Sequence, residues 1–291
     1  MPSELRGRVL KRLGLLHTPS SDMKGLSAVY RAWCAAVPFD NIRKMIALRT
    51  QASGSLPGSD AIDFFEAWLA YGCGGTCWAS NNALYTLLRS LGFQARPVAG
   101  SMRDVGVINH GSIKVALDRR DWLVDSSMLT NEPLPLGSSV YISKDRVFGG
   151  EVEPVDGTHI VWMAVPPHDD GFPCRLLQDP IDPAFQMKAY EASRSQSPFN
   201  ERIYARRNRP DAMVVVRGPT RFQRSARGVE RMDLSREQLC AVLCEEIGIS
   251  ETLVEAWVRS GGLDATFVPF SGPPPAPLKM KAPSKRNSAL G

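Results

Sequence analysis

Residues 72–82 read GCGGTCWASNN and join two predicted helices through a glycine turn. Gly74 and Gly75 permit a tight turn, and Cys77 follows in the first turn of a helix predicted from Cys77 to Leu91. A thiol at that position feels the positive end of the helix dipole, which favours the nucleophilic thiolate form. The stretch therefore predicts a reactive cysteine. A buried structural cysteine is the alternative at this point.

The residues before this stretch have a helical pattern. Apolar residues recur at helical spacing from Leu26 to Val37, and Pro38 predicts the end of that helix. A second helix is predicted over Ala61–Tyr71, with Asp60 as its N-cap and Gly72 at its end. Residues 1–100 are therefore expected to form a helical lobe that carries the nucleophile.

The pattern changes to short strands after residue 93. Strands are predicted at Gln94–Gly100, Gly111–Leu117, Trp122–Asp125 and Thr158–Val165. We expect residues 101–195 to form an antiparallel β-barrel or sandwich. His110 stands at the entry to the second strand and Asp125 at the end of the third.

The C-terminal part has mixed character. Residues 212–217 (AMVVVR) predict a strand and Ser235–Ile247 an amphipathic helix, within a lid lobe over residues 196–270. Residues 271–291 are basic and Pro-rich without an aromatic residue, which predicts a disordered tail. The order of a helical lobe, a β lobe and a mixed lobe gives an α+β fold.

Composition narrows the class of protein. The 291 residues have a net charge of +5, too small a charge to indicate a nucleic-acid binder. No apolar run approaches the roughly 18 residues that a membrane helix needs. The N-terminal segment lacks the pattern of a secretory signal, so a cytoplasmic location without a membrane partner is expected. Six cysteines are too few for a disulfide scaffold and are expected to be thiols.

The spacing of His110 and Asp125 favours a catalytic role for Cys77. The two residues stand fifteen positions apart, at the start of one strand and the end of the next in a predicted hairpin. Neighbouring antiparallel strands bring such ends together. The acid can then hold the imidazole in one tautomer while the other ring nitrogen faces the sulfur. Cys77, His110 and Asp125 are therefore predicted as a catalytic triad.

Competing sites carry less weight. The C-x3-C pairs Cys73/Cys77 and Cys240/Cys244 could together hold zinc, but the second pair is predicted on a helix among apolar residues, so no metal site is expected. The other histidines lack a Cys–Asp context; they are His17, His159 and His168. Nucleotide-binding loops and the serine-hydrolase motif are absent from the sequence.

Nine arginines lie between Arg202 and Arg231, against Asp211 and Glu230. One interpretation is a solvated face. The other is an anion site for a phosphorylated carrier, either coenzyme A or a carrier protein with phosphopantetheine, because arginine binds phosphate through two hydrogen bonds. A nucleic-acid surface is the least favoured because few aromatic residues are interleaved.

Several blocks of the chain, from about Leu26 to Leu263, resemble the arylamine N-acetyltransferase family. They are Val37–Asn41 against its I-P-F-E-N, Gly74–Trp78 against R-G-G-Y-C-F, Leu91–Phe93 against L-G-F, His110 against H-M-V, Val124–Asp125 against V-D, and Ser197–Asn200 against S-P-F-T. The chain departs from the family at Cys73, Ala79, Gly111–Ser112 and Ser126–Met128.

This resemblance implies a fold, a reaction and a cofactor requirement. The fold would be a helical bundle, a β-barrel and an α/β lid around a cysteine-protease-like core. Cys77 would take an acyl group from a thioester, His110 would activate it, and Asp125 would orient His110. No permanent cofactor is implied, only acyl-CoA or a carrier thioester as co-substrate. Donor binding is expected in the lid around Ser197, Phe199 and Arg217.

Three other functions remain open at this stage. The altered surroundings of the triad would suit a larger acyl chain, as in chain-releasing relatives of antibiotic assembly: amide synthases and Dieckmann-type cyclases that act on tethered polyketide or peptide chains. A more distant resemblance, through G-x-C-W and L-G-F-x-A-R, is to transglutaminase-like enzymes. The third possibility is a binding module that has lost activity. In the transferase reading, the acceptor is a small molecule and an acyl carrier protein is a possible partner.

Overall fold

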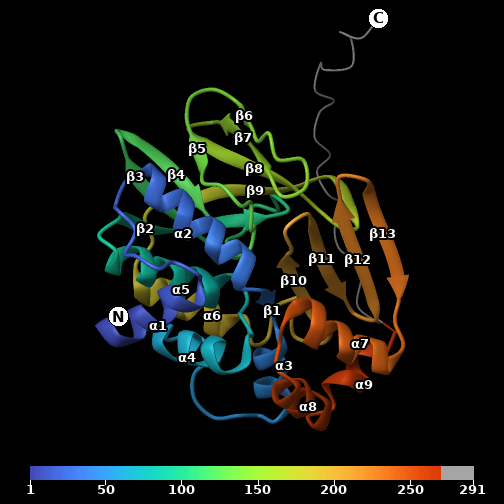
Figure 1. The fold of residues 1–291 in the computed structure, drawn as a ribbon. Helices are drawn as coiled ribbons and strands as arrows, with labels where there is room; N and C mark the ends of the chain where they lie inside the picture. The colour runs from blue at the N-terminus through green and yellow to red at the C-terminus, as the bar shows by residue number, and fades with distance from the viewer. Residues whose placement is uncertain (270–291) are drawn as a thin grey trace, which may run out of the picture.

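The computed structural model describes residues 1–269, except the side chains of residues 168–170. The predicted basic tail, residues 271–291, lies outside the described residues. Figure 1 shows a helical lobe at the N-terminus, a curved sheet drawn mostly in green and yellow-green, and an orange-to-red C-terminal lobe beside them. Within residues 1–269, no helix is long and apolar enough to cross a membrane.

The helical lobe forms as its sequence predicts. Asp60 caps the helix over Ala61–Tyr71 by accepting hydrogen bonds from the amides of Ile62 and Asp63, and Gly72 ends it in the left-handed conformation. The lobe contains α1 (Ser3–Arg12), α2 (Met23–Ala36), α3 (Ile42–Arg49), α4 (Ala61–Tyr71) and α5 (Cys77–Ser90).

The second lobe is an eight-stranded antiparallel sheet in the order β5-β4-β3-β2-β9-β8-β7-β6. Because β5 also contacts β7, the sheet curls into a nearly closed barrel, so the barrel alternative is confirmed over the sandwich. The strands are β2 (Gln94–Met102), β3 (His110–Leu117), β4 (Arg120–Val124), β5 (Leu134–Leu136), β6 (Tyr141–Ile142), β7 (Gly150–Val155), β8 (Thr158–Val165) and β9 (His168–Gln178).

The third lobe is joined to the first through a five-stranded sheet. The short strand β1 (Phe39–Asp40) of the helical lobe pairs with β10 (Tyr204–Asn208), the first strand of the lid. The remaining strands are β11 (Ala212–Arg217), β12 (Thr220–Ser225) and β13 (Gly228–Asp233). The helices of this part are α7 (Arg236–Val242), α8 (Glu251–Arg259) and α9 (Gly262–Phe267), whereas α6 (Pro183–Ala192) packs against α5 of the helical lobe.

One helix of the lid differs from its prediction. A single helix was expected over Ser235–Ile247, and Ser235 does cap it with a reciprocal bond to Gln238. The α-helical part ends at Val242, and residues Leu243–Ile247 form a π-helical turn that Gly248 terminates in the left-handed conformation. The apolar face of α7 and this turn is buried against β10 and β11, which places Leu239 and Leu243 in the core of the lid.

Helix α5 lies between the other helices and the barrel. Its apolar side chains are buried in one continuous core with the helical lobe and with Ile113 and Val115 of β3. Contacts of α5 with β2 and β3 hold it against the barrel. Cys77 is the first residue of α5 and therefore lies at the end of the barrel where β3 begins.

Candidate functional site

A glycine turn delivers Cys77 to the start of α5. The Gly74 amide donates to the Asp40 carboxylate at 2.6 Å, and a Cβ at Gly74 would lie 1.8 Å from the Pro38 carbonyl oxygen. Only glycine fits there. Thr76 is the extended N-cap residue. The first-turn amides of α5, where Cys77 stands, have no partners inside the helix.

Strand register brings His110 and Asp125 together. Val124 pairs with Ile113, so Asp125, the next residue, lies across from Ser112. Ser112 stands two residues from His110 on β3, and residues two apart in a strand share one face of the sheet. His110 Nε2 lies 2.7 Å from Asp125 Oδ2. The predicted proximity of these two side chains is therefore present.

Cys77 completes the cluster. Its side chain interacts with His110 strongly enough to raise the pKa of the imidazole, while Asp125 Oδ2 lies 2.7 Å from the ring nitrogen Nε2. The three side chains are almost fully buried: Cys77 is 8% exposed, His110 2% and Asp125 1%. A nucleophile, a base and an orienting acid in that order are the geometry that covalent catalysis requires.

The second oxygen of Asp125 is held by the loop that follows it. Asp125 Oδ1 accepts from the Ser127 amide at 2.8 Å, from the Ser127 hydroxyl at 2.6 Å and from the Met128 amide at 3.0 Å. Oδ2 is left for His110. The carboxylate therefore has a fixed orientation, with one oxygen for the loop and the other for the imidazole.

Asn81 of α5 and Tyr30 of α2 form hydrogen bonds that connect the helices to the strand ends carrying His110 and Asp125. Asn81, one turn after Cys77, donates to the Gly111 carbonyl at 2.6 Å and accepts from the Ser126 amide at 2.9 Å. The Tyr30 hydroxyl donates to the Asp125 carbonyl at 2.8 Å and accepts from the Asp125 amide at 3.2 Å. Both residues join α-helices to the strand ends, and neither role was predicted from the sequence.

The buried pair has strongly shifted pKa values. Burial alone lowers the pKa of His110, but the Asp125 charge and the hydrogen bonds to Asp125 and Cys77 raise it well above 6.5. Burial alone raises the pKa of Asp125, but the His110 charge and the hydrogen bonds from His110 and Ser127 lower it overall. Both shifts favour the charged forms of the pair, the imidazolium and the carboxylate.

Two other cysteines lie near the site and remain thiols. Burial raises the pKa of Cys174 to about 12, and its thiol is close enough to His110 and Cys77 to interact electrostatically with both. Burial also raises the pKa of Cys73. All six cysteines are free. Over residues 1–269 no cluster of three or more histidine, cysteine or acidic side chains could hold a metal ion.

A buried lysine that interacts electrostatically with Cys77 was missed by the sequence analysis. Lys44 of α3 is 3% exposed, and its ammonium donates to Ser193 Oγ at 2.8 Å and lies over the Tyr190 ring. Burial lowers the pKa of Lys44 to about 8, although the electrostatic interaction with Cys77 opposes that shift. The position of Lys44 in the sequence gives no sign of burial, because lysine is usually exposed.

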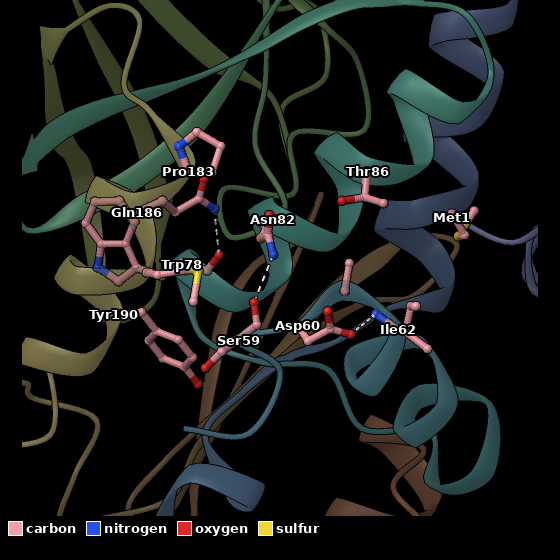
Figure 2. A pocket seen from close by; sticks show the side chains of 12 residues that line it. Met1, Ser59, Asp60, Ile62, Trp78, Asn82, Thr86, Pro183, Gln186 and Tyr190 are labelled. Carbon is pink, nitrogen blue, oxygen red and sulfur yellow. Dashed lines mark hydrogen bonds between the residues drawn. The ribbon is translucent and has the colours of Figure 1, made fainter. Parts of the chain in front are cut away.

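A cavity of about 320 Å³ borders the neighbouring face of α5. Trp78, Asn82 and Thr86 follow each other at helical spacing along that face, and Gln186 and Tyr190 of α6 close the opposite side (Figure 2). The Gln186 amide donates to the Trp78 carbonyl at 3.1 Å. Cys77, His110 and Asp125 are not among the lining residues of this cavity.

The predicted donor-binding residues lie in different settings. The Phe199 ring packs edge-on against Phe39 and Tyr204, and the Ser197 hydroxyl accepts from the Phe199 amide at 3.2 Å. Phe39 bridges to Gly75 in the glycine turn, so Phe199 is linked to the approach to Cys77. Arg217 is exposed at the end of β11.

Several arginines of the 202–231 stretch contact the protein itself. Arg221 forms an ion pair with Glu246 and Arg231 one with Asp233. Arg206 and Arg207 donate to backbone carbonyls. These contacts give the stretch a structural role at those four positions.

Comparisons with known proteins agree with the fold. Residues 22–149, which carry all three predicted catalytic residues, match the N-acetyltransferase family model. A Proansamycin X synthase from Amycolatopsis mediterranei (strain S699) is 29% identical over 121 residues, which are 40% of this chain. The matched segment is 45% of the synthase, less than half of its length.

Solved structures share the whole fold at low sequence identity. The arylamine N-acetyltransferase of M. smegmatis is 19% identical, with a TM-score of 0.76 over 89% of this chain and 98% of that one. The Mycobacterium marinum arylamine N-acetyltransferase in complex with CoA is 16% identical, with a TM-score of 0.75 over 89% and 97% of the two chains. The family-model match agrees with the predicted resemblance, and the solved structures confirm the predicted fold, which is that of arylamine N-acetyltransferases.

Proposed function

We propose that the chain is a cysteine-dependent acyltransferase in which Cys77 carries the acyl group between a thioester donor and a nucleophilic acceptor. The observation that carries this proposal is the contact chain from Cys77 through His110 to Asp125 inside a fold shared with arylamine N-acetyltransferases. The match to the N-acetyltransferase family supports acyl transfer as the class of reaction.

The first half-reaction acylates the enzyme. The Cys77 sulfur, its proton transferred to His110, attacks the carbonyl carbon of the donor thioester. The first-turn amides of α5 stabilise the oxyanion of the tetrahedral intermediate. When that intermediate collapses, the carbon–sulfur bond to the donor breaks and the donor thiolate leaves with the proton from His110. The products are acyl-Cys77 and the free thiol.

The second half-reaction regenerates the enzyme. An amine or another nucleophile attacks the acyl carbon while His110 accepts its proton. The bond between the Cys77 sulfur and the carbonyl carbon then breaks, and the sulfur regains a proton from His110. Asp125 keeps the imidazole oriented and stabilises its positive form throughout, because its Oδ2 faces Nε2 at 2.7 Å.

The donor is a thioester of coenzyme A or of a carrier protein. A structural neighbour was solved in complex with CoA, which supports CoA as co-substrate. We place the donor beside the segment Ser197–Phe199, since Phe199 reaches the glycine turn through Phe39. Arg217, exposed at the end of β11, is the candidate for binding the donor phosphates.

Chain release is the second candidate function. It is favoured by the similarity to Proansamycin X synthase. In this version the nucleophile belongs to the acyl chain itself, and attack on acyl-Cys77 closes a ring as an amide synthase or a Dieckmann-type cyclase would. The same three side chains serve both versions, because only the origin of the nucleophile differs.

Intact-protein mass spectrometry tests the proposal. The protein is incubated briefly with acetyl-CoA and, separately, with the pantetheine thioester of a long acyl chain. We expect an adduct of the mass of the acyl group. An acetyl adduct supports transfer from CoA, and an adduct from the long thioester alone supports chain release.

Two variants control this measurement. Cys77→Ala removes the proposed nucleophile and should give no adduct. Cys174→Ala removes a buried thiol beside the same histidine and should leave the adduct unchanged. The proposal fails if neither thioester acylates the wild-type protein, or if Cys77→Ala is still acylated at the wild-type rate.

A further inference from the structure

Arg206 is a buried guanidinium on the far side of the loop that holds Asp125. It is 2% exposed on β10, the lid strand that pairs with β1. Its Nη2 donates to the Ser127 carbonyl at 2.6 Å and also to the Met128 carbonyl. Ser127 and Met128 are the two residues whose amides hold Asp125 Oδ1.

The backbone hydrogen bonds of residues 127–128 thus connect the loop to two different side chains. The amides of Ser127 and Met128 point to Asp125, and the carbonyls of the same two residues point to Arg206. The loop cannot shift toward solvent without breaking the bonds to Arg206. It cannot rotate without taking the amide donors away from Asp125.

A neighbouring lid residue holds the next part of the loop. Asn208, two residues beyond Arg206 and therefore on the same face of β10, donates to the Leu129 carbonyl at 2.7 Å and to Asn131 Oδ1 at 2.8 Å. The lid strand therefore fixes residues 127–131 along their length. The triad itself is contributed only by the first two lobes.

The charge of Arg206 is not needed for these bonds. Among the described residues, no carboxylate lies within ion-pair distance of Arg206, and its Nε is buried without a hydrogen-bond partner. Burying a guanidinium against carbonyls alone is costly, and a neutral donor such as Asn208 forms the same kind of bond at lower cost. Hydrogen bonding to these carbonyls therefore does not by itself require an arginine at this position.

We propose that Arg206 is a positioning residue: it fixes the 127–128 turn, and through it the carboxylate of Asp125 and the ring of His110. This inference rests on the proposed acyl transfer through Cys77. The lid then contributes to the active site, because a lid strand sets the geometry of a triad whose residues lie in the other two lobes.

Arg206→Met and Arg206→Lys test this role, with Arg207→Met as the matched control. Arg207 is the next residue of β10, on the opposite face, and it also donates to backbone carbonyls, those of Ala35 and Ile247. It does not touch the loop. Both methionine variants lose a guanidinium bonded to carbonyls, but only one of them frees the 127–128 turn.

Two readouts are measured on each folded variant. One is the rate of acyl-Cys77 formation as a function of thioester concentration. The other is the titration of His110 followed by NMR, assigned by the signal lost in His110→Gln. We expect Arg206→Met to lower the maximal acylation rate by about 100-fold with little change in half-saturation. The pKa of His110 should fall, because a misoriented Asp125 supports the imidazolium less well.

The outcomes separate the inference from the proposed function. Intermediate values in Arg206→Lys and wild-type values in Arg207→Met would support it, since an ammonium can still donate to one of the two carbonyls. An acylation rate and a His110 titration in Arg206→Met equal to those of Arg207→Met would overturn it. If Arg206→Met does not fold, wild-type behaviour of Arg206→Lys in both readouts overturns it.

Failure of the wild-type protein to form any acyl adduct would refute the proposed function instead. The His110 titration then still decides whether Arg206 positions the pair, because it does not depend on turnover.

Discussion

The two oxygens of the Asp125 carboxylate have different partners, and this division can be tested at the scale of the residue. Oδ2 faces His110, and Oδ1 faces the loop amides. Asp125→Asn keeps the size of the side chain but removes the charge that stabilises the imidazolium. We expect acyl transfer to fall by about four orders of magnitude with an unchanged fold, as measured by single-turnover acylation and circular dichroism. A loss of less than tenfold would remove Asp125 from the proposed triad.

Gly111 and Trp78 are complementary in volume. A Cβ at Gly111 would lie 2.6 Å from the Trp78 ring, closer than side-chain atoms approach one another. We expect Gly111→Ala to destabilise the protein by roughly 1–3 kcal/mol in denaturant unfolding, and to slow acylation because Gly111 follows His110. Adding Trp78→Phe should restore part of the stability by making room.

The control for this substitution is Gly137→Ala, since nothing lies within 4 Å of a Cβ at Gly137. Equal stabilities of the two alanine variants would contradict the packing argument.

These residue-level facts differ in how far the sequence could predict them. The proximity of His110 and Asp125 follows from hairpin register, which the strand pattern contains. The role of Arg206 does not, because its partners lie in another lobe, 79 and 78 positions away. The fit of Gly111 to Trp78 is likewise a contact between a strand and a helix that no local pattern encodes.

At the scale of the element, helix α2 anchors the end of strand β4. The Tyr30 hydroxyl on α2 bonds to the carbonyl and amide of Asp125 and accepts from the Thr130 amide at 3.3 Å. Tyr30→Phe would leave these buried backbone groups without a partner. We expect a loss of about 1–3 kcal/mol in the free energy of unfolding, measured by urea denaturation.

The matched control is Tyr71→Phe, because the Tyr71 side chain is 40% exposed. A Tyr30→Phe variant as stable as that control would show that the hydroxyl does not hold the strand end.

The boundaries of a helix can be predicted from the sequence where a capping residue or a glycine begins or ends the helix. Asp60 and Gly72 define α4 as predicted, because capping and the left-handed conformation are local properties. The helix predicted over Ser235–Ile247 changes to a π-helical turn after Val242. Its apolar spacing is helical throughout, so the change depends on packing against the lid sheet, which the sequence pattern does not contain.

At the scale of the whole molecule, the buried His110–Asp125 pair links stability to pH. The pKa of His110 is raised well above 6.5, so its contribution is complete below pH 6.5 and is lost as the pH rises through the raised value. The pKa of Asp125 is lowered from 3.8, so its contribution is complete above that pH and is lost as the pH falls.

The double variant His110→Gln/Asp125→Asn provides the reference, since it replaces both charged groups with neutral ones. The advantage of the wild type in thermal unfolding should be greatest between about pH 4 and 6.5. It should decrease toward alkaline pH. An advantage that grows from pH 6 to pH 9 would contradict the assigned charges.

The arrangement of the lobes follows from the sequence only in part. The order of helices, strands and lid was readable from hydrophobic periodicity. The pairing of β1 with β10, which joins the first and third lobes, was not, because a two-residue strand gives too short a pattern. That pairing brings Phe199 beside Phe39 and Arg206 beside the loop after Asp125.

A pulse–chase experiment tests the central claim, that Cys77 carries the acyl group from donor to acceptor. The enzyme is acylated with the thioester that reacts, freed of donor by gel filtration, and mapped by peptide mass spectrometry before and after an amine acceptor is added. We predict that the acyl group lies on Cys77 and leaves it as amide product appears at the same rate. For a self-cyclising chain, the acyl group should leave as the ring without an added acceptor. An acyl group found on another side chain, or one that stays on Cys77 while product accumulates, would contradict the account.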